Sequence, residues 1–185
     1  LHLEAAGGAG YVVVTNRAGL LLLNPATVTN IVGLFGGGPL PYELDGAGPY
    51  PHLSELAASA ISILEKGPSG FFLLIEGGNI DHACHANDLP RMIPDVLEFE
   101  KAVQTVANWA KKRQDTLIIV TADHETGGLQ VVKNNGRGKN PTVEWRNKTK
   151  GHTSKKVPLW AWGINSDRIT PDMANTNIFQ VMVLQ

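Results

Sequence analysis

The sequence contains only one cysteine, Cys84, so the chain cannot form an internal disulfide and its redox compartment stays open. No apolar run approaches the roughly 20 residues that a membrane-spanning helix requires. The formal net charge is -1, so no excess of either sign points to nucleic acid or to a membrane surface as a partner. Charged residues make up 18% and hydrophobic residues 43% of the chain, which is typical of a folded globular protein.

The chain also lacks an initiating methionine and a secretory leader, since it begins at Leu1. Near its other end, residues 178–184 are mostly apolar and carry no helix stop signal. Both ends look cut, so we expect a partial domain, and the missing leader says nothing about secretion. Residues 1–185 contain no separate linker and no internal repeat, and we expect a single α/β unit.

Two apolar runs, residues 70–75 and 116–122, each end abruptly in polar residues. Short runs of this kind predict strands that are buried on both faces of a parallel sheet. Shorter runs predict further strands at 11–15, 31–35 and 157–163, with a short helix within 17–23. Apolar periodicity predicts longer helices at 53–64 and 95–112, the latter opened by a capping pair of Asp95 and Glu98. The polar stretch 133–150 is typical of an exposed hairpin tip or an insertion.

Polar residues that suit a metal follow the first run. Asp81 and His85 are four residues apart, so on a helix they share one face and can bind one ion. Zinc accepts carboxylate and imidazole ligands, and a catalytic zinc needs three protein ligands with a fourth position open. His152, which precedes another predicted strand, is the candidate third ligand.

A second pair, Asp123 and His124, follows the run 116–122, where a turning backbone lets adjacent side chains face one cation. Glu76, at the end of the first run, offers a hard oxygen that suits magnesium. The alternative interpretation is that all these residues are polar caps on strand ends. Three clusters of ligand-type residues beside predicted strands favour metal binding. His2 and His52 lie in predicted loops without partners, and Cys84 is interpreted as a small buried residue and not as a thiolate ligand.

At these residues the sequence resembles the alkaline phosphatases. The run Glu76-Gly77-Gly78-Asn79-Ile80-Asp81-His82-Ala83-Cys84-His85-Ala86-Asn87-Asp88 resembles that family's first metal motif. The run Thr121-Ala122-Asp123-His124-Glu125-Thr126-Gly127-Gly128 resembles the second, and Gly151-His152-Thr153 the third. The resemblance implies the family fold, a central, mostly parallel sheet flanked by helices, of which this chain would be the C-terminal portion.

The resemblance also implies metal-dependent hydrolysis of small phosphomonoesters, with two zinc ions and one magnesium ion. Asp81, His85 and His152 would ligate the first zinc, Asp123 and His124 the second, and Glu76 the magnesium. His82 would contact phosphate through water. The resemblance also implies a periplasmic or secreted location. It leaves open whether the protein forms a homodimer.

One departure limits the expected activity. The family's serine or threonine nucleophile, the aspartate that bridges zinc and magnesium, and the phosphate-binding arginine have no counterpart here in a matching context. Ser59 and Ser62 lie on the amphipathic stretch 53–64. We therefore expect one complete zinc site, a second that is partial, one magnesium ligand, and little or no activity without a front segment. The alternatives are a silent metal-binding fragment or assembly partner, and another hydrolase of the same superfamily, such as a phosphodiesterase or sulfatase.

Overall fold

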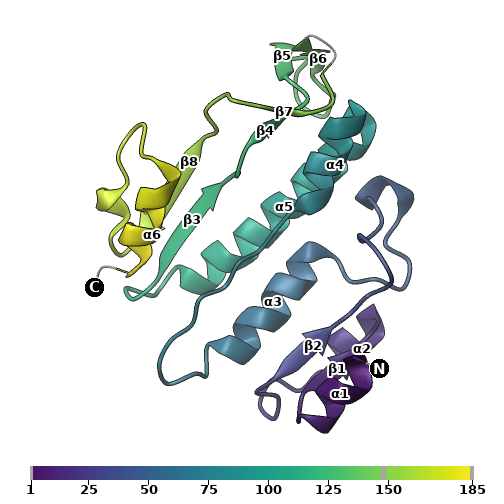
Figure 1. The fold of residues 1–185 in the computed structure, drawn as a ribbon, viewed down its shortest axis with the longest axis vertical. Helices are drawn as coiled ribbons and strands as arrows, with labels where there is room; N and C mark the ends of the chain where they lie inside the picture. The colour runs from purple at the N-terminus through teal and green to yellow at the C-terminus, as the bar shows by residue number, and fades with distance from the viewer. Residues whose placement is uncertain (1, 147–148, 184–185) are drawn as a thin grey trace.

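The structure is a computed structural model that describes residues 2–146 and 149–183 and contains both helices and short strands (Figure 1). The first part of the chain forms α1 (His2–Gly8), β1 (Val12–Val14), α2 (Arg17–Leu21), β2 (Ile31–Gly33), η1 (Glu43–Asp45) and α3 (Leu53–Leu64). The middle forms α4 (Gly78–Ala86) and α5 (Leu89–Ala110). The last part forms β3 (Leu117–Thr121), β4 (Glu125–Thr126), β5 (Leu129–Lys133), β6 (Thr142–Trp145), β7 (His152–Thr153), β8 (Leu159–Gly163), η3 (Ser166–Arg168) and α6 (Asn175–Val183).

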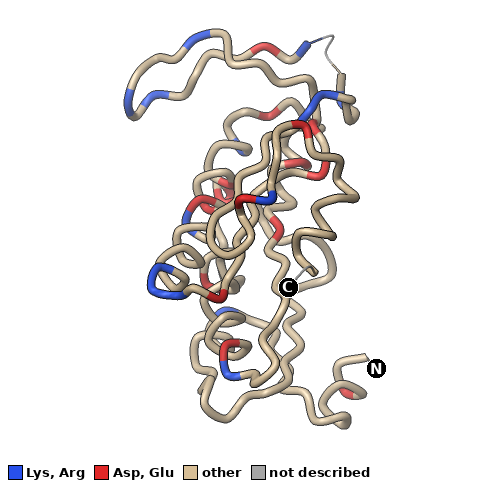
Figure 2. Tube along the Cα trace, turned by 90° about the vertical axis from the view of Figure 1, so that its left-hand side faces the viewer, with Lys and Arg blue, Asp and Glu red and all other residues tan. Residues whose placement is uncertain are grey.

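The described strands pair in two-stranded ladders. β1 and β2 run parallel, whereas β3–β8, β4–β7 and β5–β6 are antiparallel. β5 and β6 form the hairpin that the polar stretch predicted, and the backbone trace in Figure 2 marks Lys and Arg positions in blue along this projecting loop. Among the described residues, no helix is both long and apolar enough to cross a bilayer.

Helix α3 packs against α5 and occupies the range that the apolar periodicity predicted (Figure 1). Its buried side chains are Ala57, Ile61 and Ile63. Helix α5 begins earlier than expected, because Asp88 caps it by accepting a hydrogen bond of 3.1 Å from the backbone N–H of Arg91. The expected capping pair of Asp95 and Glu98 is therefore wrong, and both residues lie inside the helix.

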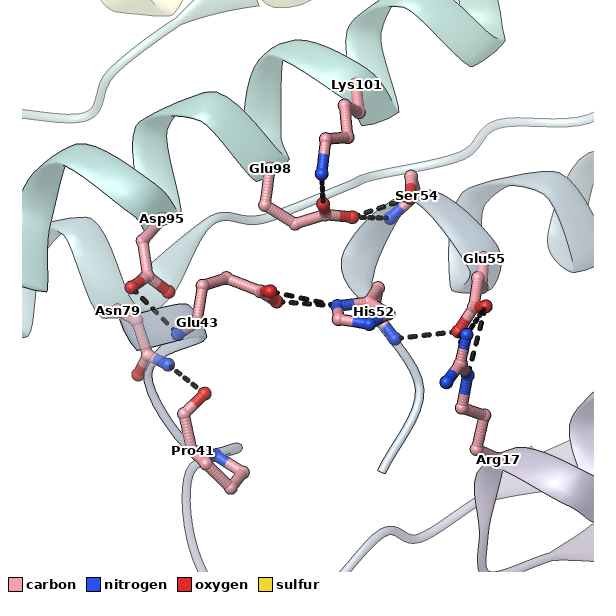
Figure 3. A network of polar contacts seen from close by, with 10 residues as sticks. All are labelled: Arg17, Pro41, Glu43, His52, Ser54, Glu55, Asn79, Asp95, Glu98 and Lys101. Carbon is pink, nitrogen blue, oxygen red and sulfur yellow. Dashed lines mark hydrogen bonds and ion pairs between the residues drawn. The ribbon is translucent and has the colours of Figure 1, made fainter. Parts of the chain in front are cut away.

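Asp95 and Glu98 instead face α3 and the loop before it (Figure 3). The Glu98 side chain is buried, accepts hydrogen bonds from Ser54 N–H (3.0 Å) and Oγ (2.5 Å), and pairs with Lys101 (3.0 Å). Burial opposes ionisation of Glu98, yet these partners outweigh it and hold the pKa of Glu98 below its ordinary value. Asp95 accepts a 3.2 Å bond from Glu43 N–H, and burial raises the pKa of Asp95.

The same network corrects the expectation that His52 has no partners. His52 Nδ1 lies 2.9 Å from Glu43 Oε2, and its backbone N–H donates to Glu55 Oε2 at 3.0 Å (Figure 3). Glu55 also forms an ion pair with the guanidinium of Arg17, whose Nη2 lies 2.6 Å from Glu55 Oε1. These contacts join α2, α3 and η1, and so fix the loop that approaches the start of α4.

The predicted strand at 70–75 is absent from the structure. Residues 71–77 are neither helix nor strand, and they belong to no ladder among the described residues. Phe72 and Leu74 are 72% and 75% exposed, so the run is not buried on both faces. Composition indicates an extended apolar segment, but only neighbouring strands can bury its backbone.

Candidate metal centre

Asp81 and His85 lie on one face of α4, as their spacing predicted. His85 Nε2 is 3.2 Å from Asp81 Oδ2, and both side chains are about one third exposed. The helix ends at Asn87, whose φ of 56° is left-handed and lets the chain turn into α5. Asn87 and Asp88 of the first motif therefore have a structural role, in turning the chain and capping the next helix.

The β4–β7 ladder brings the third motif to this face. Thr126 on β4 pairs with His152 on β7, so the imidazole of His152 reaches the end of α4. His152 Nε2 lies 3.2 Å from His85 Nε2 and 3.9 Å from Asp81 Oδ1. Residues 81, 85 and 152, which are far apart in sequence, thus come together as three neighbouring donors.

His124, from the second motif, joins the same cluster. Its ring stacks on that of His152 with centroids 3.4 Å apart. Its Nε2 lies 3.1 Å from Oδ2 of Asp123, whose side chain is 87% exposed. Ligand atoms of Asp81, His124 and His152 all lie within 4.8 Å of one another. The residues expected at two zinc positions therefore form one continuous cluster.

Thr126 is a member of this cluster that the sequence did not single out. Its buried hydroxyl donates to Asp81 Oδ1 at 2.5 Å and lies 3.1 Å from His124 Nδ1. Because the hydroxyl hydrogen is used on Asp81, its oxygen accepts from the Nδ1–H of His124. The sequence signal for Thr126 was its position inside the second motif. A threonine at that position is also common in strands without any role in a site.

These partners fix which imidazole nitrogens are free. His85 Nδ1 bonds the carbonyl oxygen of Lys150, so a neutral His85 carries its proton on Nδ1 and its lone pair on Nε2. The same reasoning leaves the lone pair of His124 on Nε2. Each lone pair then faces a carboxylate oxygen, that of Asp81 or of Asp123, at 3.2 Å and 3.1 Å. Such contacts are repulsive unless a proton or a cation lies between them.

The cluster fits a zinc ion by its donor chemistry and spacing. Bonds of about 2.0–2.1 Å in a tetrahedral site place neighbouring ligand atoms roughly 3.3–3.4 Å apart. The Asp81–His85 and His85–His152 separations of 3.2 Å are close to this value. A backbone carbonyl or hydroxyl on the second ring nitrogen is also the usual support of a metal-binding histidine.

Glu76 and His82 lie elsewhere. They line a cavity of about 260 Å³ that is also bordered by the loop before α3 and by Asp95. Asn79, at the start of α4, donates to the carbonyl oxygens of Leu40 and Pro41 on that loop. Glu76 is exposed, and within the described ranges no hydrogen bond or ion pair joins it to the histidine cluster.

Cys84 is buried, in agreement with its interpretation as a core residue. Burial, followed by the negative charges of Asp81 and Glu125, raises the pKa of the Cys84 thiol to about 11. Its sulfur lies 3.5 Å from the sulfur of Met92. The thiol therefore faces the helix packing and does not belong to the donor set.

Comparisons with known proteins show which family this chain resembles. A family model described as Alkaline phosphatase matches residues 3–148. Alkaline phosphatase 3 of Bacillus subtilis is 38% identical over 123 residues, which are 66% of this chain and 26% of that protein. The structure of alkaline phosphatase from the Antarctic bacterium TAB5 superposes with a TM-score of 0.82 at 28% identity, and covers 97% of this chain and 53% of that one. A TAB5 variant with Mg bound in its M3 site matches with a TM-score of 0.78, at the same identity and coverage.

The superposition confirms the expected α/β fold, which is that of the alkaline phosphatase structures. The chain spans only 26% and 27% of the lengths of two curated relatives from Bacillus subtilis.

Proposed function

The chain belongs to the alkaline phosphatase family, and from this premise we propose that it carries the zinc-binding part of a phosphomonoesterase site. The observation that supports this proposal is the convergence of three separate motifs on one cluster of facing nitrogen and oxygen donors. Small phosphomonoesters are the proposed substrates. An exported location and a homodimer remain predictions from the family resemblance.

The proposed ligands follow from the contacts. Asp81, His85 and His152 would hold the first zinc, because their donor atoms lie 3.2–3.9 Å apart and face one another. Asp123 and His124 would hold the second, with their oxygen and nitrogen 3.1 Å apart.

Glu76 would ligate magnesium, and His82 would contact phosphate through water. Magnesium in a solved family member supports a third cation of this kind. Both residues border the same cavity, which provides room for a group beside α4.

The protein's own part in the chemistry is orientation. The carbonyl of Lys150 and the hydroxyl of Thr126 hold the histidine tautomers that keep both Nε2 lone pairs free. When bound, divalent cations at such a cluster supply positive charge that stabilises the negative charge developing on a transferred phosphoryl group. The exposed side of Asp123 leaves this cluster open to a substrate from solvent.

We propose that the nucleophile is supplied from outside residues 1–185. Ser59 and Ser62 lie on α3, away from the cluster. Thr116 also follows an aspartate, but it lies immediately before β3, whereas Asp123 of the cluster lies after the end of that strand. The hydroxyl of Thr116 donates a hydrogen bond of 3.1 Å to Asp115. The chain alone should therefore bind zinc and hydrolyse phosphomonoesters poorly.

The test compares zinc content after dialysis for the chain, for His152→Ala and for His2→Ala. His2 is an exposed histidine on α1 and serves as the matched control. We expect zinc to fall in His152→Ala alone, and aryl phosphate turnover to stay at the level of a mock purification in all three. Equal zinc content in the two variants would overturn the site. Robust turnover by the chain alone would show that it holds a nucleophile. Normal zinc with no turnover after a front fragment is supplied would favour a silent metal-binding chain.

A further inference from the structure

Basic residues gather in one stretch of the sequence, residues 133–156. Eight of the chain's 16 Lys and Arg residues lie in it, against one of the 17 Asp and Glu residues, Glu144. The remainder of the chain is therefore acidic, although the formal net charge of the whole is only -1. A strongly basic segment in a nearly neutral chain indicates a surface for an anionic partner.

Six of these basic side chains have no carboxylate partner in the structure. They are exposed and form no ion pair with any residue in 2–146 or 149–183. Lys156 differs from them, because its Nζ lies 2.5 Å from Asp172 Oδ1. Cations without a neighbouring carboxylate direct their field into solvent, where it attracts anions. We call these six residues the basic arm: Lys133, Arg137, Lys139, Arg146, Lys150 and Lys155.

Backbone hydrogen bonds fix the β5–β6 hairpin to the candidate metal centre. The N–H of Gly127, just before the hairpin, donates to the carbonyl oxygen of Gly151 at 3.0 Å. The N–H of Arg146, just after β6, donates to the carbonyl oxygen of Gly128 at 3.0 Å. Both ends of the hairpin are therefore held beside the β4–β7 ladder, which carries His152.

Lys150 brings the basic arm into contact with the cluster itself. Its carbonyl oxygen bonds His85 Nδ1, whereas its side chain is exposed. Figure 2 marks further Lys and Arg positions along the projecting hairpin, and Figure 1 shows β5 and β6 next to β4, β7 and the end of α4. An anionic chain that lies along the basic arm thus has one end near the proposed zinc ligands.

The composition of the hairpin favours a polymer of phosphate groups over a nucleic acid or a membrane. Proteins that bind single-stranded nucleic acid stack its bases on aromatic side chains, and membrane-surface segments insert large apolar residues. The hairpin tip, residues 134–141, contains neither kind. Trp145 is half-buried, and a Cβ at Gly127 would lie 2.8 Å from its ring, so the ring packs against the backbone. The exposed Val131 and Val132 lie within β5, before the tip.

We propose that the basic arm binds linear phosphate polymers and holds them beside the metal cluster. Long, mobile Lys and Arg side chains that are spread along a hairpin suit a flexible chain with a negative charge on every unit. The binding itself needs no metal. Its consequence for catalysis, that phosphomonoester ends of such polymers are an additional substrate class, rests on the proposed function.

The test is calorimetric titration of the full chain with a short linear inorganic polyphosphate, with single-stranded DNA of equal charge and phosphatidylserine vesicles in parallel. We expect polyphosphate to bind most tightly. If all six side chains contact phosphates, the logarithm of its binding constant should fall with the logarithm of salt concentration with a slope of about -4, by analogy with single-stranded nucleic acid. Tighter binding of DNA or vesicles, or an affinity that salt does not change, would overturn the proposal.

Matched double variants locate the surface. Arg137→Gln with Lys139→Gln removes two charges from the tip, so polyphosphate affinity should fall on the order of tenfold and the slope should shrink by about 1.4. Lys111→Gln with Lys112→Gln removes two exposed charges just after α5 and should change neither quantity. Equal losses in both pairs would contradict the basic arm. Zinc content is measured on the same samples: a chain that binds polyphosphate but no zinc would refute the proposed function alone, and the reverse result would refute the basic arm alone.

Discussion

Replacing Thr126 with valine tests whether the cluster is organised for metal binding. The substitution keeps the shape of a buried side chain and removes one hydroxyl, which donates to Asp81 at 2.5 Å and lies 3.1 Å from His124. Without it, Asp81 loses a fixed orientation and His124 is free to place its proton on either ring nitrogen. The rest of the β4–β7 ladder stays intact.

The expected effect is larger on zinc affinity than on folding. Hydrogen bonds to charged groups contribute about 1.5–3 kcal/mol. Asp81 is 35% exposed, so water replaces part of the lost bond and we expect a stability loss of about 1 kcal/mol. Loss of an outer partner of a ligand typically weakens metal binding about 10- to 100-fold.

The assay is competition for zinc against a chelator of known affinity, with thermal unfolding measured in parallel. Thr121→Val is the matched control, because this exposed hydroxyl donates to the carbonyl of Pro158 and has no contact with the cluster. We expect unchanged zinc affinity in the control. Wild-type affinity in Thr126→Val would refute the idea that this hydroxyl positions the ligands.

Three further predictions concern the helical part of the molecule. The pKa of Glu98 is lowered in the folded chain, so the stability that its ionised form contributes is present above its ordinary pKa and is lost as pH falls through the folded-state pKa. Glu98→Gln should therefore lower the melting temperature at pH 7 by an amount that shrinks toward pH 3. An equal loss at both pH values would contradict this. Asp95 has a raised pKa, so its ionisation costs stability as pH rises. Asp95→Asn should therefore gain stability relative to the unmodified chain as pH rises above the ordinary pKa of aspartate, and a falling difference in melting temperature would contradict this. Cys84 is 7% exposed, so a thiol reagent should label it only slowly in the native chain and rapidly in denaturant, and fast native labelling would show that the α4–α5 packing opens.

Local patterns predicted much of this molecule. The helix 53–64 has the predicted bounds because its apolar stripe and its capping residues agree. Asp81 and His85 were predicted to lie on one helix face because they are four residues apart, and the structure confirms this.

Features that depend on pairing between segments far apart in the sequence were harder to predict. The β4–β7 ladder places His152 beside Asp81, and nothing local specifies that two two-residue strands meet. The role of Thr126 follows from the same pairing. The strand expected at 70–75 failed for a related reason, because an apolar run indicates extended backbone whereas burial needs neighbours. Asp95 and Glu98 resembled a capping pair, but their side chains bond a loop and a helix far away in sequence.

The most direct test of the central claim, that three motifs converge on one zinc-binding cluster, is zinc X-ray absorption spectroscopy on the chain with one equivalent of zinc. The account predicts only nitrogen and oxygen ligands, at about 2.0–2.1 Å, with the outer-shell scattering of at least two imidazole rings. A sulfur ligand at about 2.3 Å would place zinc on Cys84, and a spectrum without imidazole scattering would place it away from His85 and His152; either result would contradict the account.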